Sequence, residues 1–172
     1  SEEDAKKAVE DVIAELEITP FRHKPTHALS GGQKKQVSIA DILVMKPDII
    51  ILDEPAAALD PKHTTMVNQI VNRMTDAGIT VFMATHDVNY AYEWADQVVL
   101  FHQGKVLMQG APEVVFSNPC ALEKTNLEPP AVLELFHSLC KKQILNPSLP
   151  LPKNLKTLEQ YISDITIDTA AK

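Results

Sequence analysis

The stretch Ile49-Ile50-Ile51-Leu52-Asp53-Glu54-Pro55 decides the fold that this sequence predicts. Its four consecutive apolar residues suit a strand that is buried on both faces, as in a parallel sheet. The strand delivers two carboxylates at its carboxyl end, which is the edge where open α/β sheets bind their ligands. Because successive side chains on a strand point in opposite directions, Asp53 and Glu54 can take different roles.

Outside this stretch, the pattern alternates between helix and strand. Such alternation predicts an α/β fold with a mostly parallel sheet. After about Pro119 the pattern changes to two helices around a proline-rich linker at residues 146–152. The expected helices cover residues 3–17, 30–45, 61–74, 88–94, 131–145 and 154–166, and the expected strands cover residues 48–53, 79–84, 97–101 and 105–108.

The composition is that of an ordinary globular protein. Of the 172 residues, 45% are hydrophobic, which allows one domain with a core of its own. The net charge of −7 argues against a nucleic-acid partner, since such proteins usually need a basic face. Cys120 and Cys140 are too few for a disulfide framework and favour a reduced, intracellular protein. No stretch approaches the roughly 20 apolar residues of a transmembrane helix, and no signal peptide is expected.

The acid pair at residues 53 and 54 suits the chemistry of phosphoryl transfer. Asp53 suits Mg²⁺, a hard cation that keeps several waters and prefers carboxylate oxygen. Glu54 suits a general base that orients or deprotonates an attacking water. The alternative is an acidic pair that is merely solvated in a loop at the end of a strand.

A glycine-rich helix start lies upstream at Leu29-Ser30-Gly31-Gly32-Gln33. The two glycines let the backbone approach a ligand closely, and the amides of the first turn favour an anion there. Ser30 is a good N-cap and adds a hydroxyl donor. Taken alone, the same residues are equally consistent with a plain glycine-rich helix cap.

Two further residues follow strand ends or begin helices. His86, in Ala84-Thr85-His86-Asp87, comes directly after the second predicted strand. If the two strands are neighbours, His86 and Glu54 share one rim, where a histidine can hold the transferred phosphate or the attacking water. A structural, hydrogen-bonded histidine is the alternative. Asp60 precedes Pro61 and is expected to be the N-cap of the next helix, with any functional role added to that.

Together these motifs resemble those of ABC transporter ATP-binding subunits. Residues 29–33 resemble the signature motif, residues 49–54 the Walker B motif with its catalytic glutamate, residues 57–60 the D-loop, and His86 the switch histidine. The resemblance implies a partial P-loop NTPase (ABC ATPase) fold over residues 1–118 and a C-terminal helical extension over residues 119–172. It also implies a shared nucleotide site, in which one chain supplies the phosphate loop, Walker B and histidine, and its partner supplies the signature. Gln36 departs from the pattern, because many members have a basic residue there; we expect the change to affect packing more than chemistry.

Within that family, the sequence is similar to the cobalt and nickel importer ATPases of the energy-coupling-factor class. The similarity lies around residues 30–54 and in the tail, at Asn126-Leu127-Glu128-Pro129-Pro130 and Leu149-Pro150-Leu151-Pro152. It implies ATP and Mg²⁺ as cofactors, a second ABC ATPase subunit in a homo- or heterodimer, and integral membrane transport subunits as partners. The implied location is the cytoplasmic face of the cell membrane.

No G-x-x-x-x-G-K-[ST] phosphate loop occurs among the 172 residues, whose only glycines are Gly31, Gly32, Gly78, Gly104 and Gly110. Without such a loop the β- and γ-phosphates lose their main donors, so we expect the chain alone to hydrolyse ATP negligibly. Two alternatives are a non-catalytic module that completes or scaffolds a partner ATPase, and a soluble ABC ATPase outside transport. The intact Glu54 and His86 argue against a scaffold.

The C-terminal region contains two apolar stripes at helical spacing. We expect both to dock on their own chain, with dimerisation as the alternative. The stripes are Val132, Leu135, Phe136 and Leu139, and Leu155, Leu158, Tyr161, Ile162 and Ile165.

Overall fold

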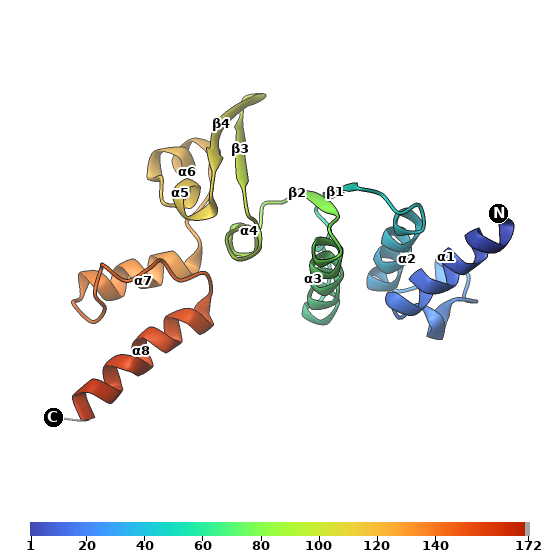
Figure 1. The fold of residues 1–172 in the computed structure, drawn as a ribbon. Helices are drawn as coiled ribbons and strands as arrows, with labels where there is room; N and C mark the ends of the chain where they lie inside the picture. The colour runs from blue at the N-terminus through green and yellow to red at the C-terminus, as the bar shows by residue number, and fades with distance from the viewer. Residues whose placement is uncertain (171–172) are drawn as a thin grey trace. The chain divides into compact units, whose positions relative to one another are not determined.

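The computed structural model describes residues 1–170, with side chains described up to residue 164. The chain forms two compact units, Ser1–Thr85 and His86–Lys172, shown in Figure 1. Each unit is described by itself.

The first unit contains one parallel pair of strands, with α3 (Pro61–Asp76) packed on one face of the pair. Strands β1 and β2 pair in parallel, from Ile49 opposite Thr80 to Asp53 opposite Ala84, so both strands end at the same edge. This confirms the predicted parallel pairing. Its elements are α1 (Glu2–Glu15), the 3₁₀ turns Thr19–Phe21 and Thr26–Ala28, α2 (Gly31–Leu43), β1 (Ile49–Asp53), α3 (Pro61–Asp76) and β2 (Thr80–Ala84).

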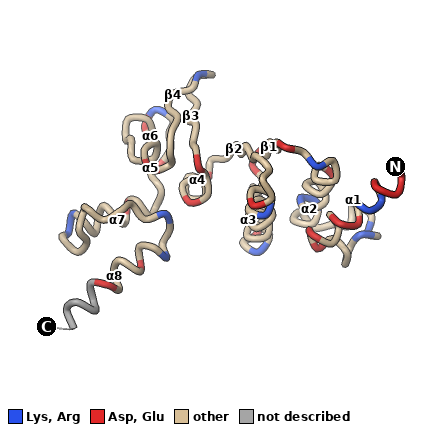
Figure 2. Tube along the Cα trace, viewed as in Figure 1, with Lys and Arg blue, Asp and Glu red and all other residues tan. Residues whose placement is uncertain are grey.

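Local sequence accounts for the helix boundaries in this unit. Helix α1 begins with a capping box in which the Ser1 hydroxyl accepts from the Asp4 amide, and its first turn is acidic. Figure 2 shows both acidic and basic residues along this helix. Helix α3 has Pro61 in its first turn and stops at Gly78, which follows the cap with a positive φ of 86°.

The prediction that β1 is buried on both faces was wrong. Ile50 and Leu52 are buried, whereas Ile49 is 58% exposed and Ile51 is 76% exposed. On β2, Phe82 is 58% exposed. Since side chains alternate along a strand, α3 covers only one face of the pair, and the described residues of this unit supply no layer for the other face.

The second unit contains an antiparallel hairpin that packs against helices α5 (Pro112–Phe116) and α6 (Pro119–Thr125). Strands β3 and β4 pair from Val98 opposite Gly110 to His102 opposite Lys105, and Gln103 and Gly104 form the turn with positive φ angles of 50° and 73°. This confirms the predicted hairpin. The elements are α4 (Val88–Trp94), β3 (Val98–His102), β4 (Lys105–Gly110), α5 (Pro112–Phe116), α6 (Pro119–Thr125), α7 (Ala131–Lys141) and α8 (Leu155–Ala170).

Helices α5 and α6 were not predicted. Each is a short helix of five or seven residues with proline in its first turn, which is too short to show a helical repeat of apolar residues. Helix α7 ends at Lys141, four residues before the predicted end, and α8 continues beyond residue 166.

One hydrophobic core joins the C-terminal helices to α4 and β3. Tyr92 of α4 is fully buried in it, and burial raises the pKa of the Tyr92 hydroxyl to about 12. The core therefore runs across residue 118, and the predicted division at that residue stays a prediction. Its buried members are Tyr92, Val98, Leu100, Val115, Phe116, Ala121, Leu122, Val132, Leu133, Phe136, Leu145 and Leu158.

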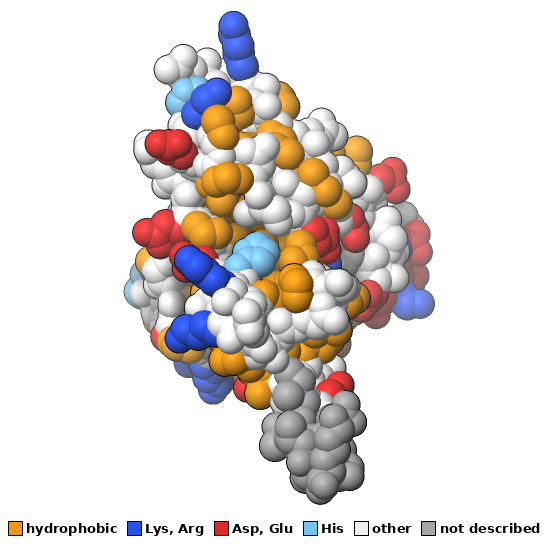
Figure 3. All heavy atoms as spheres, turned by 90° about the vertical axis from the view of Figure 1, so that its left-hand side faces the viewer, with side chains coloured by type: hydrophobic (Ala, Val, Ile, Leu, Met, Phe, Trp, Pro, Cys, Tyr) orange, Lys and Arg blue, Asp and Glu red, His pale blue; other side chains and the backbone are white. Residues whose placement is uncertain are grey.

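The two predicted tail stripes are only partly buried. Val132, Phe136 and Leu158 are in the core of this unit, as docking on the same chain requires. Leu155 is 58% exposed and Leu135 is 44% exposed. Figure 3 shows such hydrophobic side chains between charged ones on the face turned toward the viewer. Ile165 lies outside the residues whose side chains are described.

Gln36 connects α1 to α2. Its side chain is 6% exposed, and its Nε2 donates to the carbonyl oxygen of Leu16, the C-cap residue of α1, at 3.1 Å. We expect Gln36→Ala to lower the free energy of unfolding by about 1–2 kcal/mol, because a buried carbonyl loses its donor. Urea titration of the chain measures this loss. Ser38→Ala is the control, since its hydroxyl bonds within the helix at an exposed site, and an equal loss in both variants would contradict the role of Gln36.

Candidate nucleotide site

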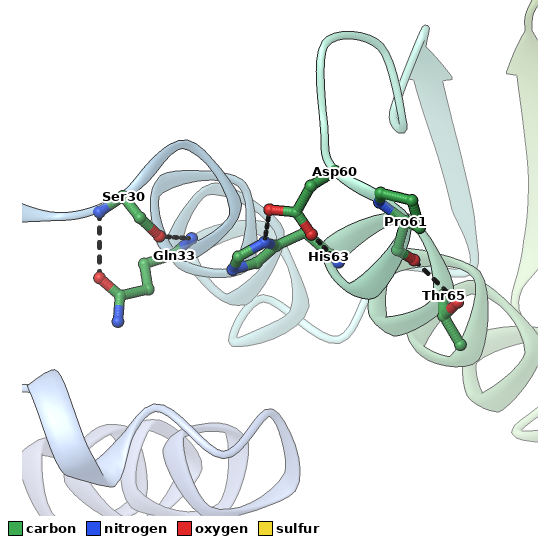
Figure 4. Close-up of polar contacts among 6 residues, drawn as sticks. All are labelled: Ser30, Gln33, Asp60, Pro61, His63 and Thr65. Atoms are coloured by element: carbon green, nitrogen blue, oxygen red, sulfur yellow. Dashed lines mark hydrogen bonds and ion pairs between the residues drawn. The ribbon is translucent and has the colours of Figure 1, made fainter.

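The start of α2 is a complete capping box. The Ser30 Oγ accepts from the Gln33 amide at 3.2 Å, and the Gln33 Oε1 accepts from the Ser30 amide at 3.0 Å (Figure 4). Gly31 is exposed, whereas Gly32 is buried. The amides of Gly31 and Gly32 lie in the first turn, where a helix offers them no internal acceptor. The predicted N-cap at Ser30 is confirmed, and the exposed side of this turn presents donors to an anion.

Asp60 caps the start of α3, which confirms its predicted structural role. Its Oδ1 accepts from the His63 amide at 3.1 Å, and its Oδ2 lies 2.5 Å from the His63 Nδ1. The hydrogen bond from the His63 amide, followed by that from the His63 ring, holds the pKa of the Asp60 carboxyl below its ordinary value of 3.8. The Asp60 carboxylate is therefore ionised at neutral pH. A role for Asp60 as a D-loop residue stays a prediction.

The ring of His63 also lies against Gly32. A Cβ atom built on Gly32 would collide with the His63 ring, and Figure 4 shows this ring between Asp60 and the start of α2. His63 thus joins the glycine-rich helix start to the loop that precedes α3. Sequence reasoning assigned His63 no role. The available signal was its position three residues after a capping aspartate, which is the spacing of a capping box.

The acid pair lies at the carboxyl end of β1, as predicted. Asp53 is exposed. Glu54 continues the strand pairing by one residue, with its amide donating to the Ala84 carbonyl at 2.9 Å. Its backbone has a left-handed φ of 43°, which a non-glycine residue rarely adopts and which turns the chain away from the strand.

Thr85 and Lys35 are among the residues that contact Glu54. The Thr85 hydroxyl donates to its Oε2 at 3.2 Å, and the Lys35 Nζ donates to its backbone carbonyl at 3.5 Å. Thr85 follows β2, and Lys35 belongs to α2, so the glycine-rich helix and both strand ends meet around the Glu54 residue. The sequence did not assign functions to Thr85 or Lys35.

His86 is exposed and begins the second compact unit. Asp87, the next residue, caps α4 by accepting from the Tyr90 amide at 3.0 Å. Because Glu54 and His86 belong to different units, their predicted common rim stays a prediction. The residue before His86, Thr85, does contact the Glu54 carboxylate.

The side chains present fit a magnesium nucleotide that brings most of its own ligands. Among the residues with described side chains, no three His, Cys, Asp or Glu groups are arranged to hold a metal ion. Mg²⁺ in nucleotide sites typically uses one or two carboxylates together with water and phosphate oxygens. A single exposed carboxylate such as Asp53, at the end of a strand, meets that requirement.

Comparisons with known proteins agree with the motifs. A family model described as ABC transporter matches residues 1–57. The cobalt import ATP-binding protein CbiO of Rhodobacter capsulatus is 39% identical over 166 residues, covering 96% of this chain and 59% of the relative. The energy-coupling factor transporter ATP-binding protein EcfA2 of Methanospirillum hungatei is 36% identical, covering 94% of this chain and 40% of the relative.

A solved structure shares the fold as well as the sequence. The cbiO1 protein of Clostridium perfringens, described as part of the ABC transporter complex cbiONQ, superimposes with a TM-score of 0.63 at 36% identity, over 82% of this chain and 55% of that one. The fold is therefore that of the α/β ABC ATPases.

The chain is homologous to ABC transporter ATP-binding proteins. Within that class, its homologues at 36–40% identity are the CbiO and EcfA ATPases of energy-coupling-factor transporters. The chain spans about 40 to 59% of the length of these two curated relatives. Within the described residues, no helix has both the length and the apolar character needed to cross a bilayer.

Proposed function

We propose that this chain forms part of an ATP-hydrolysing subunit that powers an importer of cobalt or a related metal ion. The observation that supports this best is the meeting of three motifs in one compact unit. The Ser30-capped start of α2, the Asp60 cap of α3 and the Glu54 residue are linked by His63 and Lys35. The names of the CbiO and EcfA homologues support a role in transport.

In the proposed dimer, the two groups of site residues on this chain act on different nucleotides. Residues 30–33 act on the ATP bound by the partner subunit, whereas Asp53, Glu54 and His86 act on the other ATP. Gly31 and Gly32 present their amides, and Ser30 its hydroxyl, to the γ-phosphate of ATP bound on a partner subunit. Glu54 orients and deprotonates the attacking water, Asp53 holds Mg²⁺ through water, and His86 supports the transferred phosphate. When held there, Mg²⁺ would supply positive charge that stabilises the phosphates.

The proposal includes partners as well as chemistry. A second ABC ATPase subunit completes each nucleotide site. The two ATPase subunits bind integral membrane transport subunits at the cytoplasmic face of the cell membrane and drive their conformational change. One relative is described as a cobalt import protein and another as part of a transporter complex, which supports these assignments.

Signature complementation tests the function with the chain itself. The Rhodobacter capsulatus relative, with its own signature serine replaced by arginine, is mixed with the 172-residue chain, and steady-state ATP turnover is measured. We expect turnover to rise on the order of a hundredfold. Restoring one preorganised hydrogen-bond donor that stabilises charge in the transition state has about this effect. The chain alone is expected to show negligible turnover.

Two variants of the chain control this experiment. Ser30→Arg should abolish the rise, whereas Ser148→Arg, at an exposed serine in the linker, should leave it unchanged. Titration calorimetry of the two proteins accompanies the assay. Tight association without any rise in turnover would indicate the scaffold alternative, and a rise that survives Ser30→Arg would contradict the assigned role of residues 30–33.

A further inference from the structure

Helix α4 begins two residues after His86 and is too short to hold its own orientation. It has seven residues, and isolated helices of this length are unstable in water. Its N-cap, Asp87, accepts from the Tyr90 amide at 3.0 Å. The position of the His86–Asp87 turn is therefore coupled to what packs against α4.

The first contact comes from the start of α7. Pro130, the N-cap residue of α7, provides no side-chain hydrogen bond to that helix. The side chain of Asn89, on α4, takes that place: its Oδ1 accepts from the Ala131 amide at 2.8 Å. An orphan donor of the first turn of α7 is thus satisfied by α4 rather than by its own preceding loop.

The second contact comes from the start of α8. Asn154 has two roles, since its Oδ1 accepts from the Thr157 amide at 3.0 Å and its Nδ2 donates to the Glu93 Oε1 of α4 at 3.0 Å. The residue before it is Lys153, whose Nζ lies 5.4 Å from the centroid of the Tyr92 ring. The same Nζ forms an ion pair with the Oε1 of Glu113, on α5, at 2.6 Å. The residues that directly follow the proline-rich linker, Lys153 and Asn154, therefore contact α4.

The apolar core reinforces these polar contacts. Tyr92 on α4 is fully buried in the same cluster as Phe136 of α7 and Leu158 of α8. Its ring meets Phe116 edge-on, with centroids 6.2 Å apart. Such edge-to-face pairs add to the energy of burial.

We propose that residues 131–158 act as a clamp on α4, and that Asn89 and Glu93 are positioning residues that hold the His86–Asp87 turn in one orientation. The value of that orientation to catalysis rests on the proposed function, in which His86 supports the transferred phosphate. The C-terminal helices thereby control the histidine although they lie downstream of every nucleotide motif in the sequence.

The clamp is tested by NMR on the 172-residue chain without nucleotide. In the variant Asn89→Ala/Glu93→Ala, we expect the α4 amides to exchange with solvent about tenfold faster for each hydrogen bond lost. The imidazole resonances of His86 should shift at the same time. Asn89→Asp/Glu93→Gln keeps an acceptor oxygen at both positions and should behave like the unmodified chain.

Asn118→Ala is the matched control, because Asn118 caps α6 by accepting from the Ala121 amide at 3.1 Å. It should leave α4 exchange and the His86 resonances unchanged. Unchanged α4 exchange and His86 resonances in the double alanine variant would overturn the clamp, as would equal changes in Asn118→Ala. The readout involves no ATP, so a failure of the clamp and a failure of the proposed ATP chemistry are seen separately.

Discussion

Replacing Glu54 with glutamine is expected to lower ATP turnover by about 10² to 10⁴-fold, which is the usual contribution of a positioned general base. The amide has nearly the same shape as the carboxylate and can still accept from the Thr85 hydroxyl, which lies 3.2 Å from Oε2. It cannot take a proton from water. Binding of Mg-ATP should therefore survive, and the variant should trap ATP between two subunits.

The assay needs Glu54 beside a phosphate-binding loop. A chimera supplies it by joining the part of the Rhodobacter capsulatus relative that precedes the matched region to Ser1. Phosphate release gives turnover, and filter binding gives trapped ATP. Glu17→Gln is the control, since Glu17 is an exposed glutamate with a similar left-handed φ of 55°. Unchanged turnover in Glu54→Gln would refute its role as base.

Adding one methyl group at Gly32 is expected to lower the free energy of unfolding by about 1–3 kcal/mol, the range for overpacking a buried site. A Cβ atom at this position would collide with the ring of His63, which its bond to Asp60 keeps in place. Gly32→Ala should therefore push α2 away from the start of α3. Urea titration of the 172-residue chain measures the loss.

Two comparisons isolate this contact. Gly31→Ala should be nearly neutral, because the closest atom to its Cβ is the Leu59 Cδ2 at an ordinary 4.0 Å. In a His63→Ala background, Gly32→Ala should cost less than about 0.5 kcal/mol, since residues in contact are energetically coupled. A loss that is the same with and without His63 would show that the ring is not the obstacle.

Sequence patterns predicted most elements of this chain, because the signals are local. Proline and glycine mark the ends of α3, Ser30 as an N-cap marks the start of α2, and an apolar run marks β1. The parallel pairing of β1 with β2 followed from the helix between them. The acid pair and the glycine-rich helix start were also found, since each lies at a recognisable element boundary.

What the sequence did not predict depends on tertiary contacts. The packing of His63 on Gly32 joins residues 31 positions apart, and the bond from Gln36 to Leu16 joins two helices. The exposure of Ile51 could not be inferred from an apolar run, because such a run does not say which layers cover it. The fastening of α8 to α4 spans 61 positions and likewise has no local signal.

Amide NMR of a mixed complex tests most directly whether residues 30–33 contact ATP that is bound to the other subunit. The labelled chain is combined with the unlabelled, signature-defective Rhodobacter capsulatus relative, and Mg-ATP is added. Large shifts at the amides of residues 30–33 that require both the relative and the nucleotide are the predicted result, because the phosphate is held on the other subunit. The pocket shared between two chains would be contradicted if those amides stayed unchanged, or if nucleotide alone moved them to the same extent.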